Sequence, residues 1–397
     1  MYRRTIGVMG RLLDQNDGLG LYGRNLLQEM LKLDPHSRYL IFLNTPQSQH
    51  MFDEFPNAQT CVAPARSKLW WDQVLVPLAA RRHDVTLLFN PKFSIPLLTG
   101  RPCVFVHQGS DWYVNPQNYL WWDNLYIRLM LPLYDRKARL TLSISQATLD
   151  DLARLSPIDV SKSVVTYAGV SQNFTPQRDE AAIKQFLADY ALPQRFILTV
   201  ARVIHGGHPG QPFYPGGNNE RLLRAWRRYR RAGGELPLVM AGARIEPYLR
   251  AQGFTDADLE DVFFPGFIPN ARIHMAYQQA ECFILATLCE SFGIPILEAL
   301  ASGCPAIVPS TCASPEVAGG AARLIDPLDE DGIVAALLEV TGSPELRARM
   351  REQGLKRAHE LTWKDAAART LAAFERIAPV RAPAEAALSL PTGKPAT

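Results

Sequence analysis

The sequence predicts an α/β protein built from two doubly wound parallel-sheet domains. Short apolar runs of strand length alternate with helical patterns along the chain, which is typical of parallel sheets covered by helices on both faces. With 397 residues, the chain is long enough for two domains that each bury their own core. Ligands of such sheets bind beyond the carboxyl ends of the strands, so the residues that follow each strand are the candidates for function.

The chain is expected to divide into a first domain over residues 1–175 and a second domain over residues 195–360. Residues 176–194 carry no core pattern beyond one short helix and are expected to form the linker. A further helix over 361–378 follows the second domain. The Pro- and Ala-rich tail, 379–397, is expected to be disordered.

Composition excludes several classes of protein. A net charge of only +3 argues against nucleic acid as the main partner. No apolar run approaches the roughly 20 residues of a membrane-spanning helix, and the first residues lead directly into a strand, so no signal peptide is expected. The six cysteines include no Cys-x-x-Cys pair, and we expect them to be reduced thiols of a cytosolic protein rather than disulfides or a metal cage.

The first domain begins as strand, glycine loop and helix. Strands are expected at 6–9, 39–43, 84–89, 103–107, 140–145 and 163–167, and helices at 22–33, 69–82 and 146–155. Gly18 and Gly20 lie in the first loop, where backbone amides could approach a phosphate in front of a helix N-terminus. Two glycines in such a loop often only form a turn. His107 ends a strand, and a lone histidine there is more often structural than catalytic.

Residues 111–139 are rich in aromatic side chains, interleaved with leucines and with Arg128, Arg136, Lys137 and Arg139. The simpler interpretation is an amphipathic helix packed on its domain. The alternative is a platform at a membrane interface, or a stacking floor for acceptor sugars.

The second domain is expected to contain strands at 196–202, 237–242 and 282–286, and helices at 220–231, 330–340, 344–360 and 363–377. The arginines of the helix 220–231 are interpreted as a solvated face, with anionic lipid as the lesser alternative. His205 and His208 lie in a Gly/Pro insertion, 204–217, without nearby acids, so a metal site there is not favoured.

The segment 289–305 reads as a strand end, a tight turn and a helix start. Gly293 permits the turn, and Pro295 suits the first turn of a helix. The free N–H groups of residues 292–294 would attract anionic or hydroxyl-rich ligands. Glu290 and Glu298 frame this turn with seven residues between them. They are either a cap and a helix-dipole partner, or two carboxylates that hold the vicinal diols of a sugar.

The stretch Glu-Ser-Phe-Gly-Ile-Pro-Ile-Leu-Glu, 290–298, resembles the Glu-(seven residues)-Glu signature of the retaining family-4 glycosyltransferases, which have the GT-B fold of two Rossmann-like domains facing across a cleft. Ser-Pro-Glu-Val-Ala-Gly-Gly, 314–320, continues the resemblance. It implies that Glu290 contacts the transferred sugar and Glu298 the ribose of a nucleotide. Ser291, Phe292, Gly293 and Ile294 would then face the sugar and the diphosphate.

Other segments resemble the same family. The loop 17–22 is similar to "GGIGRY", with Asp17 and Leu21 as departures, which implies that Gly18 and Gly20 lie over the donor phosphate. His107 matches the histidine of a His-Asp pair and is implied to lie near the reacting sugar, although Gln108 replaces the Asp.

In the second domain, the resemblance implies that Arg202 clamps the diphosphate. The Lys of the family's phosphate clamp is absent, and Asn218 and Asn219 occupy its place after the insertion 204–217. Of these two, Asn219 is our donor-binding candidate. The segment 262–269 is similar to the strand end that meets the base, which implies Gly266, Phe267 and Ile268 as base-binding residues. The family's closing helix usually crosses back onto the first domain.

The resemblance implies a retaining hexosyltransferase that moves a sugar from a nucleotide diphosphate to an acceptor hydroxyl, with Glu290, His107 and Arg202 as its catalytic residues. The acceptor would be a saccharide or lipid-linked saccharide of bacterial polysaccharide or glycoconjugate assembly. No metal or other cofactor is expected, and the setting would be the cytoplasm, with peripheral contact at the inner face of the membrane. The alternatives are a weakened sugar-nucleotide-binding module and another GT-B enzyme, such as a sugar-nucleotide epimerase.

Overall fold

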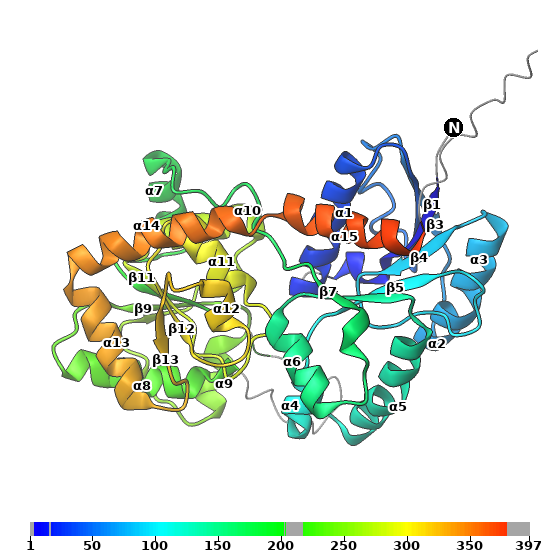
Figure 1. Ribbon diagram of the computed structural model, residues 1–397. Helices are drawn as coiled ribbons and strands as arrows, with labels where there is room; N and C mark the ends of the chain where they lie inside the picture. Colours follow the sequence, from blue (N-terminus) through cyan, green and yellow to red (C-terminus); the bar gives the residue numbers. More distant parts are fainter. Residues whose placement is uncertain (1–3, 16, 202, 204–216, 379–397) are drawn as a thin grey trace, which may run out of the picture.

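The computed structural model describes residues 4–15, 17–201, 203 and 217–378. Within them the chain forms two parallel sheets, one in each half (Figure 1). The first has seven strands in the order β3-β2-β1-β4-β5-β6-β7, and the second has six in the order β10-β9-β8-β11-β12-β13. In each sheet the order reverses beside the first strand, β1 or β8, as in doubly wound folds. The predicted α/β fold class is confirmed.

The first sheet contains β1 (Thr5–Met9), β2 (Arg38–Leu43), β3 (Ala58–Val62), β4 (Leu87–Asn90), β5 (Cys103–His107), β6 (Leu140–Ser143) and β7 (Ser163–Val165). Its α-helices are α1 (Gly18–Leu33), α2 (Lys68–Trp70), α3 (Val76–Arg82), α4 (Asp111–Val114), α5 (Trp121–Lys137) and α6 (Gln146–Leu155). The edge strand β3 was not predicted, because its short, half-exposed sequence has no strong apolar run.

The helix predicted over 69–82 is interrupted. A π-helical turn, Trp71–Leu75, separates α2 from α3. Pro77 cannot donate a helical hydrogen bond, and a wider turn before it accommodates that loss. The turn also buries Trp71 against the sheet. The short 3₁₀ helices of the described chain are η1 (Gly10–Asp14), η3 (Pro116–Asn118), η4 (Val160–Lys162) and η6 (Asp256–Asp258).

The second sheet contains β8 (Ile197–Val200), β9 (Leu238–Ala241), β10 (Val262–Phe263), β11 (Cys282–Ile284), β12 (Ala306–Pro309) and β13 (Arg323–Ile325). Its helices are α8 (Asn219–Arg231), α9 (Ile245–Ala251), α10 (Asn270–Gln279), α11 (Ile294–Ala301), α12 (Ser314–Ala318), α13 (Glu330–Gly342) and α14 (Pro344–Glu360). The predicted linker contains α7 (Glu180–Asp189), which buries Ile183 and Phe186 and packs on α10.

The last helix, α15 (Trp363–Ile377), leaves the second half of the chain and lies on the first, as Figure 1 shows. It packs along α1, where the rings of Trp363 and Tyr22 meet edge to face at 5.6 Å between centroids. Near its end, Glu375 forms an ion pair of 2.8 Å with Arg4. The two halves are therefore joined both by the linker and by this returning helix.

Helices cover both faces of the first sheet. On β5, Val104 and Val106 face the core shared with α1 and α15, whereas Cys103 and Phe105 face the core shared with α3 and α5. This alternation follows from the two-residue period of a strand. No helix in the described part of the chain combines the length and apolar composition required to cross a bilayer.

Candidate active site

The loops at the carboxyl edge of the second sheet are held together by hydrogen bonds. The Asn218 side chain donates to the carbonyl of Ala286 after β11 at 2.8 Å, and the Gly242 amide after β9 donates to the Gly266 carbonyl at 2.8 Å. The Ala313 amide after β12 donates to the Glu290 carbonyl at 3.1 Å. Most of the predicted donor-binding residues therefore lie along one edge of one sheet.

The predicted turn and helix start is present at the centre of this edge. Gly293 has a φ of +88° and caps α11, with Pro295 in the first turn. Because four N–H groups at a helix start have no intrahelical acceptor, such ends bind anions. The N–H groups of Phe292, Gly293 and Ile294 donate to no acceptor within the described residues. They are available to the oxygens of a ligand.

Glu298 lies on the inward side of α11 and is only 6% exposed. The Tyr277 hydroxyl of α10 donates to its Oε2 at 3.1 Å. Burial raises the pKa of Glu298 to about 7, and the hydrogen bond from Tyr277 opposes part of that rise. As a partner of the helix dipole alone, this carboxyl would not need to be buried. Its placement suits a carboxylate that accepts hydrogen bonds from the hydroxyl groups of a ligand.

This raised pKa predicts how the stability of the ligand-free protein depends on pH. The Glu298 carboxyl binds its proton more tightly in the folded protein than in the unfolded chain. The stability that this proton contributes is therefore fully present below pH 4.5 and is lost as the pH rises towards 7. The free energy of unfolding should fall by about 3 kcal/mol over that window from this group alone. Urea unfolding at several pH values measures it. The matched variant Glu298→Gln should lack this slope, and an identical slope in both proteins would assign it to other groups.

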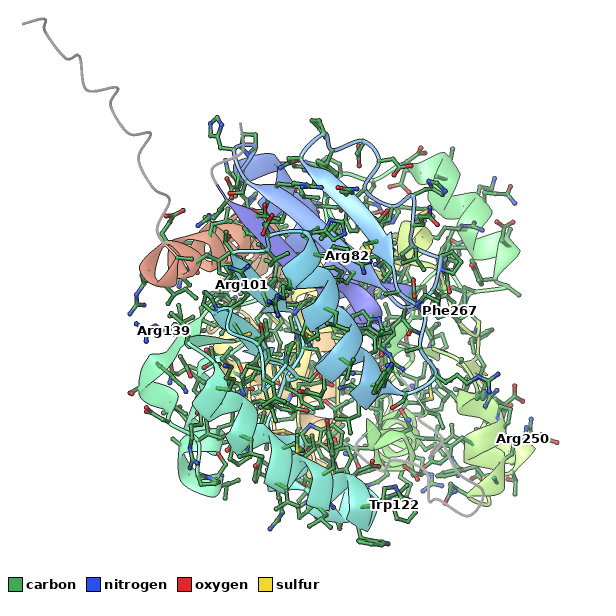
Figure 2. All side chains as sticks on the ribbon, turned by 90° about the vertical axis from the view of Figure 1, so that its right-hand side faces the viewer. Arg82, Arg101, Trp122, Arg139, Arg250 and Phe267 are labelled. Carbon is green, nitrogen blue, oxygen red and sulfur yellow. A yellow bond between two sulfur atoms is a disulfide. The ribbon has the colours of Figure 1, made fainter. Side chains whose placement is uncertain are left out.

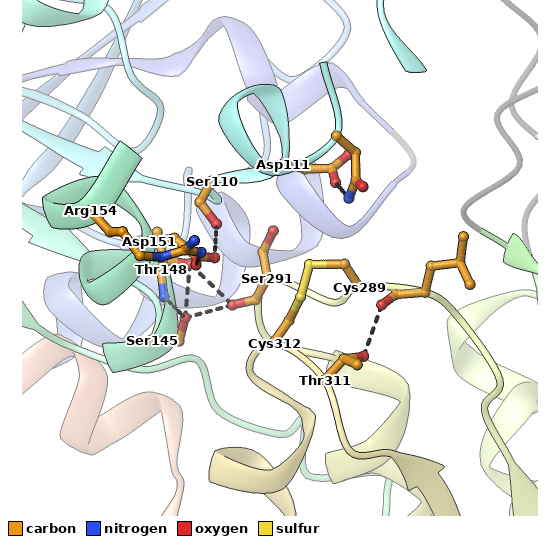
Figure 3. The surroundings of a disulfide bond; sticks show 12 residues. Ser110, Asp111, Ser145, Thr148, Asp151, Arg154, Cys289, Ser291, Thr311 and Cys312 are labelled. Carbon is orange, nitrogen blue, oxygen red and sulfur yellow. Dashed lines mark hydrogen bonds and ion pairs between the residues drawn. A yellow bond between two sulfur atoms is a disulfide. The ribbon is translucent and has the colours of Figure 1, made fainter. Parts of the chain in front are cut away.

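A disulfide lies next to Glu290. Cys289 and Cys312 are bonded, with their Cα atoms 5.3 Å apart (Figure 3). The expectation that all six cysteines are reduced is therefore wrong for this pair. The two residues follow β11 and β12, whose carboxyl ends are adjacent in the sheet, so proximity arises without a Cys-x-x-Cys spacing. The bond ties the loop of Glu290 to the loop before α12.

The first domain meets the motif at Ser291. The Ser145 hydroxyl, which also caps α6, donates to the Ser291 carbonyl at 2.7 Å (Figure 3). Gly109, two residues beyond β5, lies so close that an added Cβ would be 2.2 Å from the Ser291 Oγ. Only glycine permits this approach. The carboxyl edges of the two sheets therefore face each other at the motif.

Glu316 of α12 makes a second contact between the domains that the sequence did not reveal. Its two carboxylate oxygens accept hydrogen bonds from the amides of Gln146 and Ala147 at 2.8 and 3.0 Å. These amides begin α6, where a negative charge is favourable. Glu316 belongs to the Ser-Pro-Glu-Val segment that carried the family resemblance, and this was the signal available.

We expect the variant Glu316→Gln to favour a more open arrangement of the two domains. The amide loses charge-assisted bonds at the start of α6, at a cost of about 1–2 kcal/mol. Small-angle X-ray scattering should show a larger radius of gyration than that of the unsubstituted protein. The control Glu360→Gln removes a carboxylate that pairs with Arg357 within α14, and it should leave the radius of gyration unchanged. Equal radii for all three proteins would remove this role from Glu316.

The structure buries His107 on the α5 side of the first sheet, with 1% exposure. Its Nε2 is 3.9 Å from the Asp135 carboxylate, but Lys162 pairs with that acid at 3.2 Å. Burial, together with the charge of Lys162, lowers the pKa of His107 to about 3, so the ring is neutral and forms no true ion pair. No hydrogen bond joins it to the motif within the described residues. This position favours the structural interpretation of His107.

The predicted phosphate loop is shorter in the structure, because α1 begins at Gly18. Asp17 caps it by accepting from the amides of Leu19 and Gly20. A Cβ on Gly20 would lie 1.9 Å from the Gln15 carbonyl, whereas Gly18 faces open space. Local packing thus explains Gly20, and Gly18 is the residue whose surroundings leave room for a ligand.

At the expected phosphate clamp, Arg202, His205 and His208 lie outside the described residues. Asn219 is buried, and its Oδ1 has no partner within the described chain. The Arg221 guanidinium donates to Asn218, so a cation does lie at the start of α8. The sequence did not single out Arg221, because the helix is rich in arginine.

The predicted base-binding residues follow β10. Gly266 adopts a φ of +73°, Ile268 is buried, and the Phe267 ring is 63% exposed. An exposed aromatic ring at this edge offers a flat apolar surface to a base. Two surface pockets, of about 420 and 330 Å³, lie elsewhere and are lined by neither Glu290 nor Glu298.

Known proteins share both the fold and the central sequence. Residues 214–357 match the family described as glycosyl transferases group 1. The chain is 25% identical to the O-antigen chain mannosyltransferase B of Escherichia coli over 75% of its length and 76% of the relative's. Matches to two further curated relatives cover 25% and 32% of those proteins.

Solved structures agree on the fold. A sucrose-phosphate synthase from Thermosynechococcus elongatus has a TM-score of 0.73 at 15% identity, covering 94% of this chain and 98% of its own. Anabaena HepE, in complex with UDP and glucose, has a TM-score of 0.71 at 14% identity, covering 94% of this chain and 100% of its own. The chain therefore has the GT-B fold. The segment that is similar to the glycosyl transferases group 1 contains Glu290, Glu298 and Glu316.

Proposed function

We propose that this protein is a retaining family-4 hexosyltransferase that takes its sugar from a nucleotide diphosphate. One observation carries the proposal: Glu290 and Glu298 frame the open N-terminus of α11 at the sheet edge that faces the first domain. Carboxylates accept hydrogen bonds from the hydroxyls of sugars, and helix N-termini hold diphosphates. Glu290 would orient the transferred sugar and Glu298 the ribose.

The proposed reaction occurs on one face of the sugar. The bond between the anomeric carbon and the diphosphate oxygen breaks, and its electron pair leaves with the diphosphate. The acceptor oxygen forms the new bond to that carbon on the same face, and its proton passes to the leaving diphosphate. The protein contributes positioning and charge stabilisation.

The proposed parts of this site come from both domains. The N–H groups of 292–294, together with Arg202 and Arg221, would stabilise the leaving diphosphate, and Gly18 would admit it beside α1. Phe267, with Gly266 and Ile268, would hold the base. His107 is assigned to the support of the β5 end rather than to the sugar. No metal ion is required, because amides and cations neutralise the phosphates.

The donor and acceptor follow from the relatives only as a proposal. E. coli relatives are named O-antigen chain and serotype-specific mannosyltransferases. We therefore propose a mannosyl or other hexosyl donor, and a saccharide or lipid-linked saccharide acceptor of polysaccharide assembly. The proposed setting is the cytoplasm, with peripheral contact at the inner face of the membrane.

Two measurements test this proposal. Thermal shift with a panel of uridine, guanosine, adenosine and thymidine diphosphate sugars identifies the donor, because a bound ligand raises the apparent stability. Hydrolysis of that donor is then followed with and without EDTA, and the anomeric configuration of the released sugar is read by NMR. The expected result is metal-independent hydrolysis with retention. Tight binding without any turnover would instead establish a sugar-nucleotide-binding module, and an inverted product would contradict the retaining mechanism.

A further inference from the structure

Helix α5 is apolar on two opposite sides. Its inward stripe, Ile127, Leu131 and Tyr134, packs into the core with Phe105 and Trp71. Its outward stripe is exposed along its whole length. It begins with the adjacent pair Trp121 and Trp122 and continues at about one helical turn with Leu125, Leu129 and Leu133. Trp121 is 70% exposed and Leu129 is 59% exposed. A surface helix ordinarily carries polar residues on its second side, so this stripe calls for a ligand or partner.

Neighbouring elements extend the stripe. The chain from α2 to α3 covers the same face of the first sheet as α5, because residues of both pack into one core cluster. On the outward side, Leu78 is 61% exposed. Lys137 of α5 donates to the Thr99 carbonyl at 2.6 Å and so fixes the loop of Leu98, which is 96% exposed. We call this surface the apolar face: Leu69, Trp70, Leu78, Leu98, Trp121, Trp122, Leu125, Leu129 and Leu133.

Arginines surround the apolar face. Figure 2 looks onto this side of the molecule, with Trp122 at one end of α5 and Arg139 beyond its other end. Arg82 and Arg101 are seen on the same side. The complete set is Arg81, Arg82, Arg101, Arg128, Arg136 and Arg139, and none of them forms an ion pair within the described residues.

The arginines of α8 show the opposite arrangement. Arg224 pairs with Glu330 at 2.8 Å, Arg230 pairs with Asp261 at 2.7 Å, and Arg227 pairs with Asp258. The charge of these three arginines is neutralised within the second domain, which argues against the lipid contact considered for that helix. The positive charge around the apolar face is left for an anionic partner.

We propose that the apolar face docks on a bilayer of anionic lipids, with α5 lying in the interfacial plane. Tryptophan and leucine side chains would enter the boundary between headgroups and acyl chains, and the arginines would contact lipid phosphates. A second copy of the chain fits less well. A two-fold interface would place the same arginines against one another, at an electrostatic cost.

The start of α5 is connected to the candidate active site along the chain, through α4. Helix α4 begins directly after β5, and Gly109 between them contacts Ser291 of the motif. The chain from that contact to α5 is short. If the proposed transfer is correct, docking therefore brings the acceptor side of the site to the bilayer surface, where a lipid-linked saccharide would be presented. Docking itself requires neither donor nor turnover.

Vesicle co-sedimentation of the full chain tests the docking. The probes are vesicles of phosphatidylcholine alone and vesicles that also contain phosphatidylglycerol, at low and high salt. We expect binding to the anionic vesicles, weakened by salt, and little binding to phosphatidylcholine alone. Equal binding to both vesicle types, or none to either, would overturn the proposal.

Two sets of variants locate the surface. Replacing Trp121, Leu125 and Leu129 with serine should lower the vesicle partition coefficient about tenfold or more, because each exposed side chain loses its burial in lipid. The matched control replaces three exposed leucines elsewhere, Leu33, Leu155 and Leu328, and should bind as the unsubstituted protein does. Since all six residues lie at the surface, circular dichroism should show both variants folded.

The charge variant Arg128→Glu, Arg136→Glu and Arg139→Glu should also lose about tenfold or more, since each basic residue near the surface contributes to lipid binding. Its control, with Arg349, Lys356 and Arg376 changed to glutamate, has the same net charge. A dimer in solution that the serine variant dissociates, without vesicle binding, would assign the face to a second copy. Donor hydrolysis is measured without vesicles, so it does not depend on docking. A failure of the docking proposal can therefore be distinguished from a failure of the proposed function.

Discussion

Replacing Glu290 with glutamine is expected to lower kcat about 100-fold or more at saturating donor. The carboxylate follows β11, and its loop is fixed on both sides, by the Cys289–Cys312 disulfide and by the Ala313 amide. A neutral amide of the same shape keeps these supports but removes the charge that stabilises a sugar with oxocarbenium character. The donor dissociation constant should change little, because the nucleotide is held elsewhere.

The matched control for this variant is Glu281→Gln, because Glu281 and Glu290 flank the same strand. Glu281 precedes β11 and pairs with Arg195 at 2.7 Å, at the amino edge of the sheet. Its loss should leave kcat within about twofold, as for a surface ion pair. Initial rates of transfer or donor hydrolysis measure both variants. If the two substitutions had equal effects, the role of Glu290 at the sugar would be lost.

Replacing Glu298 with glutamine should have a different signature, weakening nucleotide binding about 10- to 100-fold while kcat at saturating donor stays close to that of the unsubstituted protein. A buried carboxylate can accept from both hydroxyls of a ribose, whereas an amide can accept with only one of its two atoms. Isothermal titration with the nucleoside diphosphate measures the dissociation constant directly.

The variant Tyr277→Phe distinguishes the effect of the Glu298 carboxylate from that of the hydroxyl that donates to it. The variant removes the hydroxyl that donates to Glu298 but leaves the carboxyl group in place. Affinity should fall less than tenfold, since one neutral donor contributes about 1 kcal/mol. Should Glu298→Gln bind the nucleotide as well as the unsubstituted protein does, the ribose must lie elsewhere.

The fold followed from local patterns where those patterns were long. Helices α6, α14 and α15 lie where the sequence predicts them, because capping residues and apolar spacing mark their ends. Strand β3 and helix α10 are two of the elements that were missed. The first is a half-exposed edge strand, and the second begins after Pro269 without a side-chain cap. Tertiary packing decides such elements more than local sequence does.

The candidate site was only partly accessible from the sequence. The turn at Gly293 and the two flanking acids were predicted, since turn, helix start and spacing are all local. The burial of His107, the pairing of Cys289 with Cys312 and the contact of Glu316 with α6 depend on residues distant in sequence. The disulfide arises because β11 and β12 are neighbours in the sheet, and the Glu316 contact arises because the two sheet edges face each other. No local sequence pattern predicts either arrangement.

The central claim is that the N-terminus of α11, between Glu290 and Glu298, binds a nucleotide sugar. A crystal structure of the full chain with its nucleotide sugar, identified by the thermal-shift panel, tests this most directly. The account predicts the ribose hydroxyls at Glu298, the diphosphate at the amides of 292–294 and the hexose beside Glu290. A nucleotide sugar bound away from this helix N-terminus, in contact with neither carboxylate, would contradict the claim.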